Sequence, residues 1–205
     1  MLDHLAYGTP DLEKAARELG DALGIKPLPG GQHIGQGTRN YLLPLEGGSY
    51  LELIGRDPDQ EDFTGVRPFG LNDLTQPRLA AWAIRVEGIE RRVAEARAKG
   101  YDPGSIRSMS RRRPDGSLLS WRLTDPIGNA VPILIPFLIE WGTASHPSAT
   151  SGPRARLIEF RVESPDPEPV RQALAALGVE APVDGGPRNR LRARIAGPAG
   201  ESVLD

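Results

Sequence analysis

Cysteine is absent from the 205 residues of this sequence, which excludes a disulfide framework, a thiolate metal site and a thiol nucleophile. An excess of either charge is absent as well, because 25 basic residues are balanced by 27 acidic ones. The resulting net charge of −2 gives no electrostatic attraction for nucleic acid or for an anionic membrane surface. We therefore expect no nucleic-acid partner.

Long apolar segments are missing too. The longest one, AVPILIPFLIEW, is about half as long as a membrane-spanning helix and contains two prolines. The first five residues include an acid and a histidine, whereas a secretory signal begins with basic residues and continues into an apolar core. These features predict a cytoplasmic protein that has no membrane partner.

The sequence is rich in turn-forming residues, with 24 glycines and 20 prolines, and this composition favours short strands joined by many turns. One unit also recurs: the opening stretch LDHLAYGTPDLEKAARELGDALG matches LIEFRVESPDPEPVRQALAALG near the other end, with one deletion. In each copy an apolar strand precedes an amphipathic helix that ends at a glycine, Gly24 or Gly178. Glu159 in the second copy stands where His4 stands in the first.

The predicted elements follow the order strand, helix and then two or three strands over residues 1–56, and this order recurs over residues 78–142. Residues 143–155 are small and polar and are predicted to form a linker. Residues 156–205 hold a shorter third copy. We therefore predict an α+β fold in which two paired βαβββ units form a half-barrel cleft, with a third, partial βαββ unit. The third unit needs a partner surface, from the first two units or from another chain, and we expect a homodimer.

Five segments carry a resemblance to a known family: LDHLAYGTPDLEKAA, GGQHIGQGTRNYLL, YLELIG, RRRPDGSLLSWRL and PFLIEWGTASHP. Together they resemble a glyoxalase-like subgroup of the vicinal oxygen chelate superfamily, which includes glyoxalase I, extradiol dioxygenases and fosfomycin resistance proteins. The resemblance is best over residues 2–147 and implies that residues 1–142 form a glyoxalase-like domain. It also implies curved sheets that enclose a cleft, and a lyase, isomerase or dioxygenase that acts on a small-molecule substrate.

The resemblance implies metal ligands on the first and last strands of each unit, and it places them on His4 and Glu52 in the first unit. In the second unit Ala81, which cannot bind a metal, takes the place of His4. For the last strand one alignment gives Pro132 and another gives Glu140, and we prefer Glu140 because its surroundings match the subgroup. The implied metal ligands are therefore His4, Glu52 and Glu140, which suit a divalent Mn, Fe, Ni, Zn or Mg ion. No phosphate-binding motif for a nucleotide cofactor is present.

Several polar and aromatic residues are candidates for binding or converting the substrate. His33 lies in a glycine-rich stretch that permits close backbone approach, and it is a candidate catalytic base together with the carboxylate of Glu140. Strand alternation sends Arg112 to one face of its hairpin and Arg111 and Arg113 to the other, so only one side faces the cleft. Each candidate also has a structural interpretation, as a loop histidine, a core tryptophan or a solvated hairpin tip. The predicted substrate-binding residues are His33, Asn40, Trp82, Arg112 and Trp121.

Three kinds of function remain open at this point. In the first, a divalent ion held by His4 and Glu52 chelates vicinal oxygens of a small substrate and stabilises an enolate-like charge. In the second, the chain is a non-catalytic protein that sequesters a small hydrophobic ligand, and Ala81 favours this hypothesis because it breaks the set of ligands. In the third, the chain is an assembly module without a ligand. A metal bound at His4 and Glu52 distinguishes the first from the other two.

Overall fold

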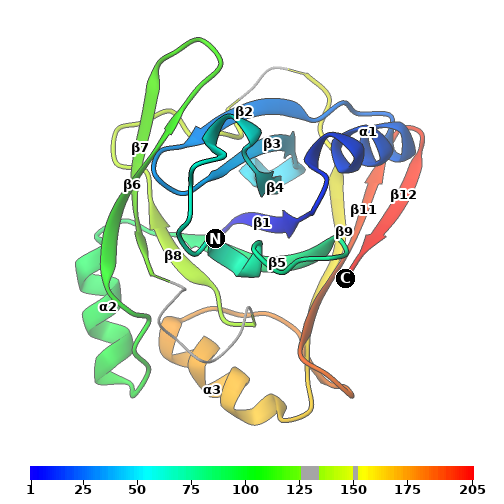
Figure 1. Ribbon diagram of the computed structural model, residues 1–205. Coiled ribbons are helices and arrows are strands. Elements are labelled where there is room, and N and C mark those ends of the chain that lie inside the picture. The colour runs from blue at the N-terminus through cyan, green and yellow to red at the C-terminus, as the bar shows by residue number, and fades with distance from the viewer. Residues whose placement is uncertain (126–133, 150–151) are drawn as a thin grey trace.

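The chain folds into a closed eight-stranded barrel with a four-stranded sheet beside it (Figure 1). The structure, a computed structural model, describes residues 1–125, 134–149 and 152–205. The strands around the barrel follow the order β1-β4-β3-β2-β6-β7-β8-β5. An α+β fold is therefore confirmed, although the sheet closes fully where the sequence predicted a half-barrel cleft.

Two consecutive stretches of chain supply the barrel. The first contains β1 (Leu2–Gly8), α1 (Leu12–Leu23), β2 (Leu28–His33), β3 (Thr38–Pro44) and β4 (Tyr50–Arg56). The second contains β5 (Arg78–Arg85), α2 (Ile89–Ala98), β6 (Ile106–Arg112), β7 (Leu118–Thr124) and β8 (Phe137–Glu140). Short 3-10 turns lie in the connections, at η1 (Glu46–Gly48), η2 (Pro58–Gln60) and η3 (Pro68–Gly70). Both helices lie outside the barrel, which leaves the inner faces of the strands to line its interior (Figure 1).

The barrel closes because β2 crosses close to β6, where Gln32 and His33 pair with that strand. Gly31 lies at this crossing with a φ of 131°. A side chain on Gly31 would meet the carbonyl oxygen of Arg112 at 1.9 Å, so only glycine permits the approach. Gly31 of the PGGQH segment thus makes closure of the sheet possible.

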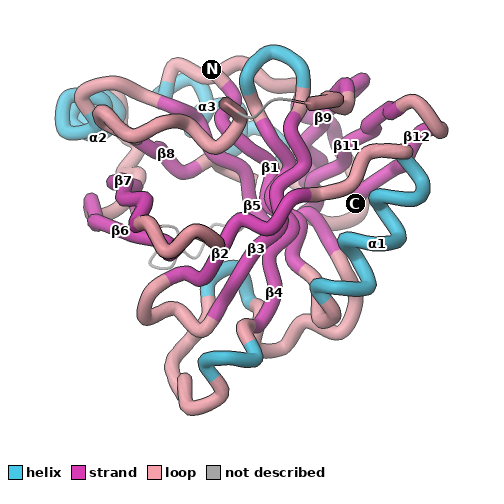
Figure 2. Tube along the Cα trace, turned by 90° about the horizontal axis from the view of Figure 1, so that it is seen from above, coloured by secondary structure: helices cyan, strands magenta, loops and turns pink. Residues whose placement is uncertain are grey.

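The second sheet is built from β9 (Arg156–Ser164), α3 (Pro167–Leu177), β10 (Val183–Gly185), β11 (Arg190–Gly197) and β12 (Gly200–Leu204). Its order is β10-β9-β11-β12, one strand more than predicted, because the short β10 pairs in parallel with β9. Apolar residues of β11, namely Leu191, Ala193 and Ile195, belong to the same hydrophobic core as the barrel and α1. The strand β12 lies beside α1 (Figure 2). This sheet therefore finds its partner surface on the barrel of its own chain.

Helix α1 shows how local sequence builds that interface. Asp11 caps its N-terminus by accepting a hydrogen bond of 3.0 Å from the backbone N–H of Lys14, and Gly24 ends it with a φ of 68°. The buried side chains recur every three or four positions and form one apolar face. They are Leu12, Ala15, Ala16, Leu19 and Leu23. Because this face meets both sheets, the helix joins them into one core.

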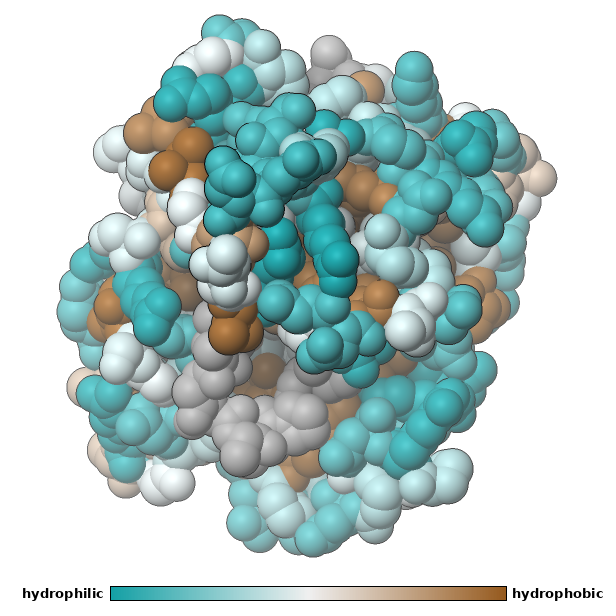
Figure 3. All heavy atoms as spheres, in the orientation of Figure 1, coloured by the Kyte–Doolittle hydropathy of each residue, from teal (hydrophilic) through white to brown (hydrophobic). Residues whose placement is uncertain are grey.

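Apolar side chains are gathered inside the molecule. The face shown in Figure 3 is mostly hydrophilic, with apolar residues in small separate groups. One buried cluster joins the barrel, the helices and the second sheet, and another lies inside the barrel. None of the helices within the described ranges is long and apolar enough to cross a membrane. The cluster inside the barrel matters most for function, because several of its members line a cavity.

Candidate functional site

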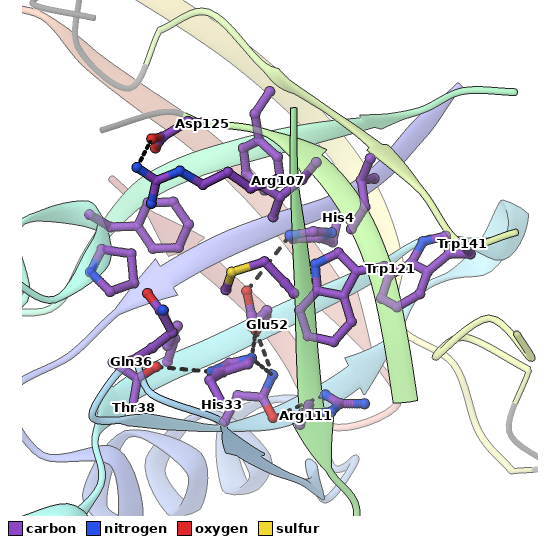
Figure 4. A pocket seen from close by; sticks show the side chains of 18 of the residues that line it. His4, His33, Gln36, Thr38, Glu52, Arg107, Arg111, Trp121, Asp125 and Trp141 are labelled. Carbon is purple, nitrogen blue, oxygen red and sulfur yellow. Dashed lines mark hydrogen bonds and ion pairs between the residues drawn. The ribbon is translucent and has the colours of Figure 1, made fainter. Parts of the chain in front are cut away.

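The interior of the barrel contains a cavity of about 70 Å³ (Figure 4). Its polar lining consists of His4, His33, Thr38, Asn40, Glu52 and Arg111, with further polar groups farther out. Its apolar wall includes Met109, Trp121, Phe137, Ile139 and Trp141. A few polar groups set in an apolar cavity are the usual composition of a small-molecule site.

His4 on β1 is held by its neighbour Asp3. The register of β1 against β5 shifts between Leu2 and His4, so Asp3 is the extra residue of a β-bulge. The bulge brings Oδ1 of Asp3 to 2.6 Å from Nδ1 of His4. Because an ionised carboxylate can only accept hydrogen bonds, Nδ1 carries the proton and donates it. The lone pair of Nε2 is then directed to the cavity side, where Oε2 of Glu52 lies 3.7 Å away.

Asp3 is itself held by hydrogen bonds from residues that follow β8, 138 and 143 positions later in the chain. Its Oδ2 accepts hydrogen bonds from Nε1 of Trp141 at 2.9 Å and from Nε2 of His146 at 2.8 Å. Burial disfavours ionisation of Asp3, but the hydrogen bonds from His146 and His4 outweigh that effect and hold its pKa well below the usual value. His146 belongs to the segment predicted as a linker, residues 143–155, so this segment completes the support of His4.

Glu52 on β4 lies between two imidazoles. Its Oε2 is 3.7 Å from Nε2 of His4, and its Oε1 is 3.6 Å from Nε2 of His33. Oε1 also accepts a hydrogen bond of 2.5 Å from Nδ2 of Asn40. The residue is only 7% exposed, so directed polar groups stabilise its charge in place of bulk water.

Asn40 on β3 connects the polar side chains of the cavity. Its Nδ2 group donates to Glu52 and lies 3.4 Å from Nε2 of His33, and its Oδ1 accepts from NH1 of Arg111 at 3.0 Å. These contacts use both amide hydrogens and one acceptor position of the oxygen. Gly30 on β2 makes room for them, because a Cβ there would lie 2.1 Å from Oδ1 of Asn40 and 2.6 Å from NH1 of Arg111.

His33 on β2 is neutral at pH 7. Burial lowers its pKa to about 4, although the charge of Glu52 acts in the opposite direction. Its Nδ1 lies 3.0 Å from Oγ1 of Thr38. With Asn40 donating to Nε2, the imidazole proton resides on Nδ1 and is donated to the Thr38 hydroxyl. Both nitrogens of this buried ring therefore have partners.

The register of the barrel shows which residues occupy the ligand positions implied for the second half. β5 runs antiparallel to β1, with His4 opposite Ala83 and Ala6 opposite Ala81. Exchanging the two strands turns the first pair into the second, so that His4 corresponds to Ala81 and Ala83 corresponds to Ala6. Ala81 therefore holds on β5 the position that His4 holds on β1. The sequence alignment placed Ala81 at the same position. An alanine there provides no metal ligand.

The same register identifies the counterpart of Glu52. Ala6 pairs with Glu52 on β4, and its equivalent Ala83 pairs with Phe137 on β8. Phe137 therefore stands where the last-strand carboxylate was expected, and it lines the cavity. Within the described ranges, no group of three or more His, Cys, Asp or Glu side chains is arranged so that it could hold a metal ion. His4 and Glu52 alone do not fit the set of four ligands that the resemblance implies for a metal ion.

Glu140 does not reach the cavity, which corrects its predicted placement as a metal ligand and catalytic residue. It follows Ile139, which faces the cavity, so alternation along β8 turns Glu140 outward. Its carboxylate accepts hydrogen bonds from the backbone N–H groups of Gly88, at 2.6 Å, and Ile89, at 3.2 Å. It also pairs with Arg122. These contacts cap the N-terminus of α2, which is a structural role.

Trp82 and Arg112 are also turned away from the cavity, against the prediction that they bind substrate. Trp82 packs against Phe160 of β9 at 4.9 Å and donates from Nε1 to the carbonyl of Leu134 at 2.9 Å. It therefore joins the barrel to the second sheet. Arg112 is exposed at the end of β6. Pro132, the other alignment for the last strand, lies outside the described residues.

The structure does bring five predicted residues together around the cavity: His4, His33, Asn40, Glu52 and Trp121. Sequence reasoning did not assign a site role to Asp3, Arg111 or Trp141. An acid directly beside a histidine, as in LDHL, was the available signal for Asp3. For Arg111 the signal was that neighbouring side chains of a strand point to opposite faces, which separates Arg111 from Arg112. This pattern does not show which of the two faces the cavity.

One solved structure shares this architecture across the whole chain. A crystal structure of a hypothetical protein from Staphylococcus aureus is 14% identical and gives a TM-score of 0.70 over 100% of this chain and 98% of that chain. Methylmalonyl-CoA epimerase from Mycobacterium tuberculosis is 22% identical, with a TM-score of 0.44 over 69% of this chain and 87% of that one. The likeness to the Staphylococcus aureus protein shows a common fold. A comparison with curated proteins gives no match.

The family model of the glyoxalase-like domain matches residues 2–178. The match includes both stretches that build the barrel and extends through α3 of the second sheet. It contains every polar residue of the cavity described above. The resemblance to the vicinal oxygen chelate superfamily is thereby confirmed, and the chain belongs to the glyoxalase-like domain family.

Proposed function

We propose that this protein is an enzyme that moves a proton on a small organic substrate bound inside the barrel. The observation that carries the proposal is the position of the Glu52 carboxylate, 3.7 Å from Nε2 of His4 and 3.6 Å from Nε2 of His33 in the cavity wall. Proton transfer requires acid–base groups that face one cavity and are fixed from behind. Asp3 and Thr38 provide this fixation, one for each imidazole.

His4 and Glu52 have complementary roles in the proposed reaction. Asp3 holds the N–H of His4, so Nε2 is the basic atom, and Asp3 stabilises the imidazolium that forms on protonation. Asn40 holds Oε1 of Glu52, which leaves Oε2 to exchange a proton. One group removes a proton from a carbon beside a carbonyl, and the C–H electron pair moves into the carbonyl to form an enolate. The removed proton passes from that group to the other, because Oε2 of Glu52 and Nε2 of His4 lie 3.7 Å apart. The other group then returns it to the enolate, so the product is an isomer of the substrate and both groups regain their starting states.

The size of the cavity favours a small substrate. One water needs about 10–15 Å³ of such space, so about 70 Å³ holds roughly five to seven water-sized groups. Phe69 lines the same cavity and stacks on Phe137, with ring centres 6.1 Å apart. Its φ of 60° is unusual for a residue with a side chain and costs about 1–3 kcal/mol.

Exchange with solvent tests the proposal. The protein is incubated in D₂O with 2-oxo acids, 2-hydroxy ketones and 2-hydroxy aldehydes, and ¹H NMR follows the loss of protons beside the carbonyl. We expect exchange of at least one compound to be faster than in buffer, and we expect Glu52→Gln and His4→Asn to abolish the acceleration. Glu140→Gln is the matched control, because Glu140 lies outside the cavity. Binding of these compounds without any accelerated exchange in the wild type would refute the proposal.

A second candidate function is non-catalytic sequestration of a small ligand. The observation that favours it is the presence of Ala81 and Phe137 at two positions where the superfamily carries ligands. An apolar wall of this kind binds an aromatic or aliphatic group. The exchange experiment separates the two candidates, because a sequestering protein binds its ligand tightly and accelerates no exchange.

A further inference from the structure

We infer that Arg111 recognises the substrate of this protein, and that the substrate carries a carboxylate. The inference rests on the proposed function and adds the chemical class of the ligand. Arg111 comes from β6, lines the cavity and is only 4% exposed. Because a guanidinium stays protonated in proteins, a full positive charge is buried in the cavity wall.

Most of the donors of Arg111 have no partner among the residues that the structure describes. A guanidinium has five N–H donors. Only NH1 of Arg111 has a side-chain hydrogen bond among the described residues, and its acceptor is the neutral amide of Asn40 at 3.0 Å. The Nε atom is buried and has no hydrogen-bond partner in the described part of the chain. None of the described carboxylates lies within 4.0 Å of this guanidinium. Buried donors left unpaired are costly, and a ligand that accepts from them removes that cost.

Glu52 does not serve as the missing partner. It carries the opposite charge, but Asn40 lies between its carboxylate and Arg111 and bonds to both. The Glu52 oxygens face His4 and His33 (Figure 4). The cation therefore stands beside the proposed proton-transfer pair without direct contact. In that position it can stabilise a substrate anion, and also the enolate charge that develops during proton transfer.

A second arginine of the cavity provides a contrast. Arg107 lies on the same face of β6 and also lines the cavity, but its NH2 pairs with Oδ2 of Asp125 at 2.8 Å. Its charge is thus already matched by a carboxylate. Arg107 is also much more exposed, with 56% of its side chain accessible. Of these two arginines, Arg111 is therefore the one whose buried charge is not matched by a described carboxylate and can be matched by a ligand.

The surroundings of Arg111 indicate what the rest of the ligand looks like. The planar fork of a guanidinium matches a carboxylate, which accepts two parallel hydrogen bonds. Arg111 shares the cavity with Met109, which lies two positions away on the same face of β6, and with Trp121, which pairs with Met109 across β6 and β7. These two side chains provide an apolar wall. The small cavity restricts the apolar part to a few carbons. The expected ligand is a short organic acid with an acidic C–H, such as a 2-oxo acid.

A matched pair of ligands tests the inference. 2-Oxobutyrate and 2-oxobutanamide have nearly the same shape and differ in charge, and ligand-observed NMR titration measures the affinity of each. We expect the wild type to bind the acid more tightly. Arg111→Gln is expected to weaken binding of the acid by roughly 10- to 100-fold and to leave the amide within about twofold. Arg112→Gln, the adjacent and outward-facing control, is expected to change neither affinity.

Equal affinity for the acid and the amide in the wild type would overturn the inference. This comparison uses the wild-type protein alone, so it does not depend on whether a variant folds. A preference for the acid that persists in folded Arg111→Gln would overturn it as well. If inorganic phosphate displaced 2-oxobutyrate at lower concentration, the site would belong to a phosphorylated ligand and the carboxylate assignment would fail. These measurements concern binding alone. Binding of the acid through Arg111 without solvent exchange would therefore refute only the proposed catalysis.

Discussion

Replacing Gly30 by alanine adds one methyl group at the point where Asn40 meets Arg111. The new Cβ would lie 2.1 Å from Oδ1 of Asn40 and 2.6 Å from NH1 of Arg111. Non-bonded carbon contacts are favourable only from about 3.5 Å, so the Asn40 amide has to move by about 1 Å or more. The displaced amide loses its hydrogen bonds to Glu52 and Arg111.

The expected destabilisation follows from two contributions. Overpacking a buried site costs about 1–3 kcal/mol. Hydrogen bonds to charged groups contribute about 1.5–3 kcal/mol each, and water in the cavity replaces part of what is lost. We therefore expect Gly30→Ala to lower the free energy of unfolding by about 2–4 kcal/mol. For a chain of this length that lowers the Tm by roughly 5–15 °C.

Thermal unfolding and the exchange assay measure the two consequences of Gly30→Ala, lower stability and loss of proton transfer. Gly185→Ala is the matched control, because its Cβ would meet no atom within 4 Å, and we expect a change within about 0.5 kcal/mol. In an Asn40→Ala background the penalty of Gly30→Ala should shrink, since the obstructing oxygen is gone. A Gly30→Ala protein that melts at the wild-type temperature and keeps its exchange activity would refute the reasoning.

Stability should depend on pH through His33, whose pKa is about 4 when folded and 6.5 when unfolded. The unfolded state takes up the proton first, so this contribution is complete above pH 6.5, and about 3 kcal/mol is lost as the pH falls to 4. Urea unfolding checks this, and an equal loss in His33→Gln would contradict it. Glu140→Ala removes the cap of α2 and the pair with Arg122, so we expect about 1–2 kcal/mol lower stability in thermal unfolding. The exchange of substrate protons with D₂O should be unchanged in this variant, and a loss of exchange would show that Glu140 takes part in the reaction. Ala81→His combined with Phe137→Glu supplies the two missing ligands, and elemental analysis after loading with Ni²⁺ should find about one equivalent in the double variant. Equal nickel content in the wild type would show that the register argument is mistaken.

Part of the site was predictable from the sequence, because its residues sit in short recognisable segments. His4 and Glu52 lie in LDHLAYG and YLELIG, and His33 with Asn40 lies in GGQHIGQGTRNYLL. Each stretch forms one strand or one tight hairpin, so local pattern and family resemblance place it. Glu140 was misplaced for a physical reason. Alternation tells which residues share a face of a strand, but the direction of that face depends on pairing with other strands.

The sequence by itself determined the family and, apart from the short β10, the order of strands and helices, because turn residues, caps and periodicity act over a few neighbouring positions. Only the tertiary structure decided that the sheet closes, that the C-terminal sheet packs on the same chain, and that Phe137 takes the position on β8 that Glu52 holds on β4. It also decided that a bulge brings Asp3 to His4 and that β6 turns Arg111 inward. The placement of Phe137 and Arg111 depends on strand register between residues far apart in the chain, and a shift of one position would turn each side chain to the other face.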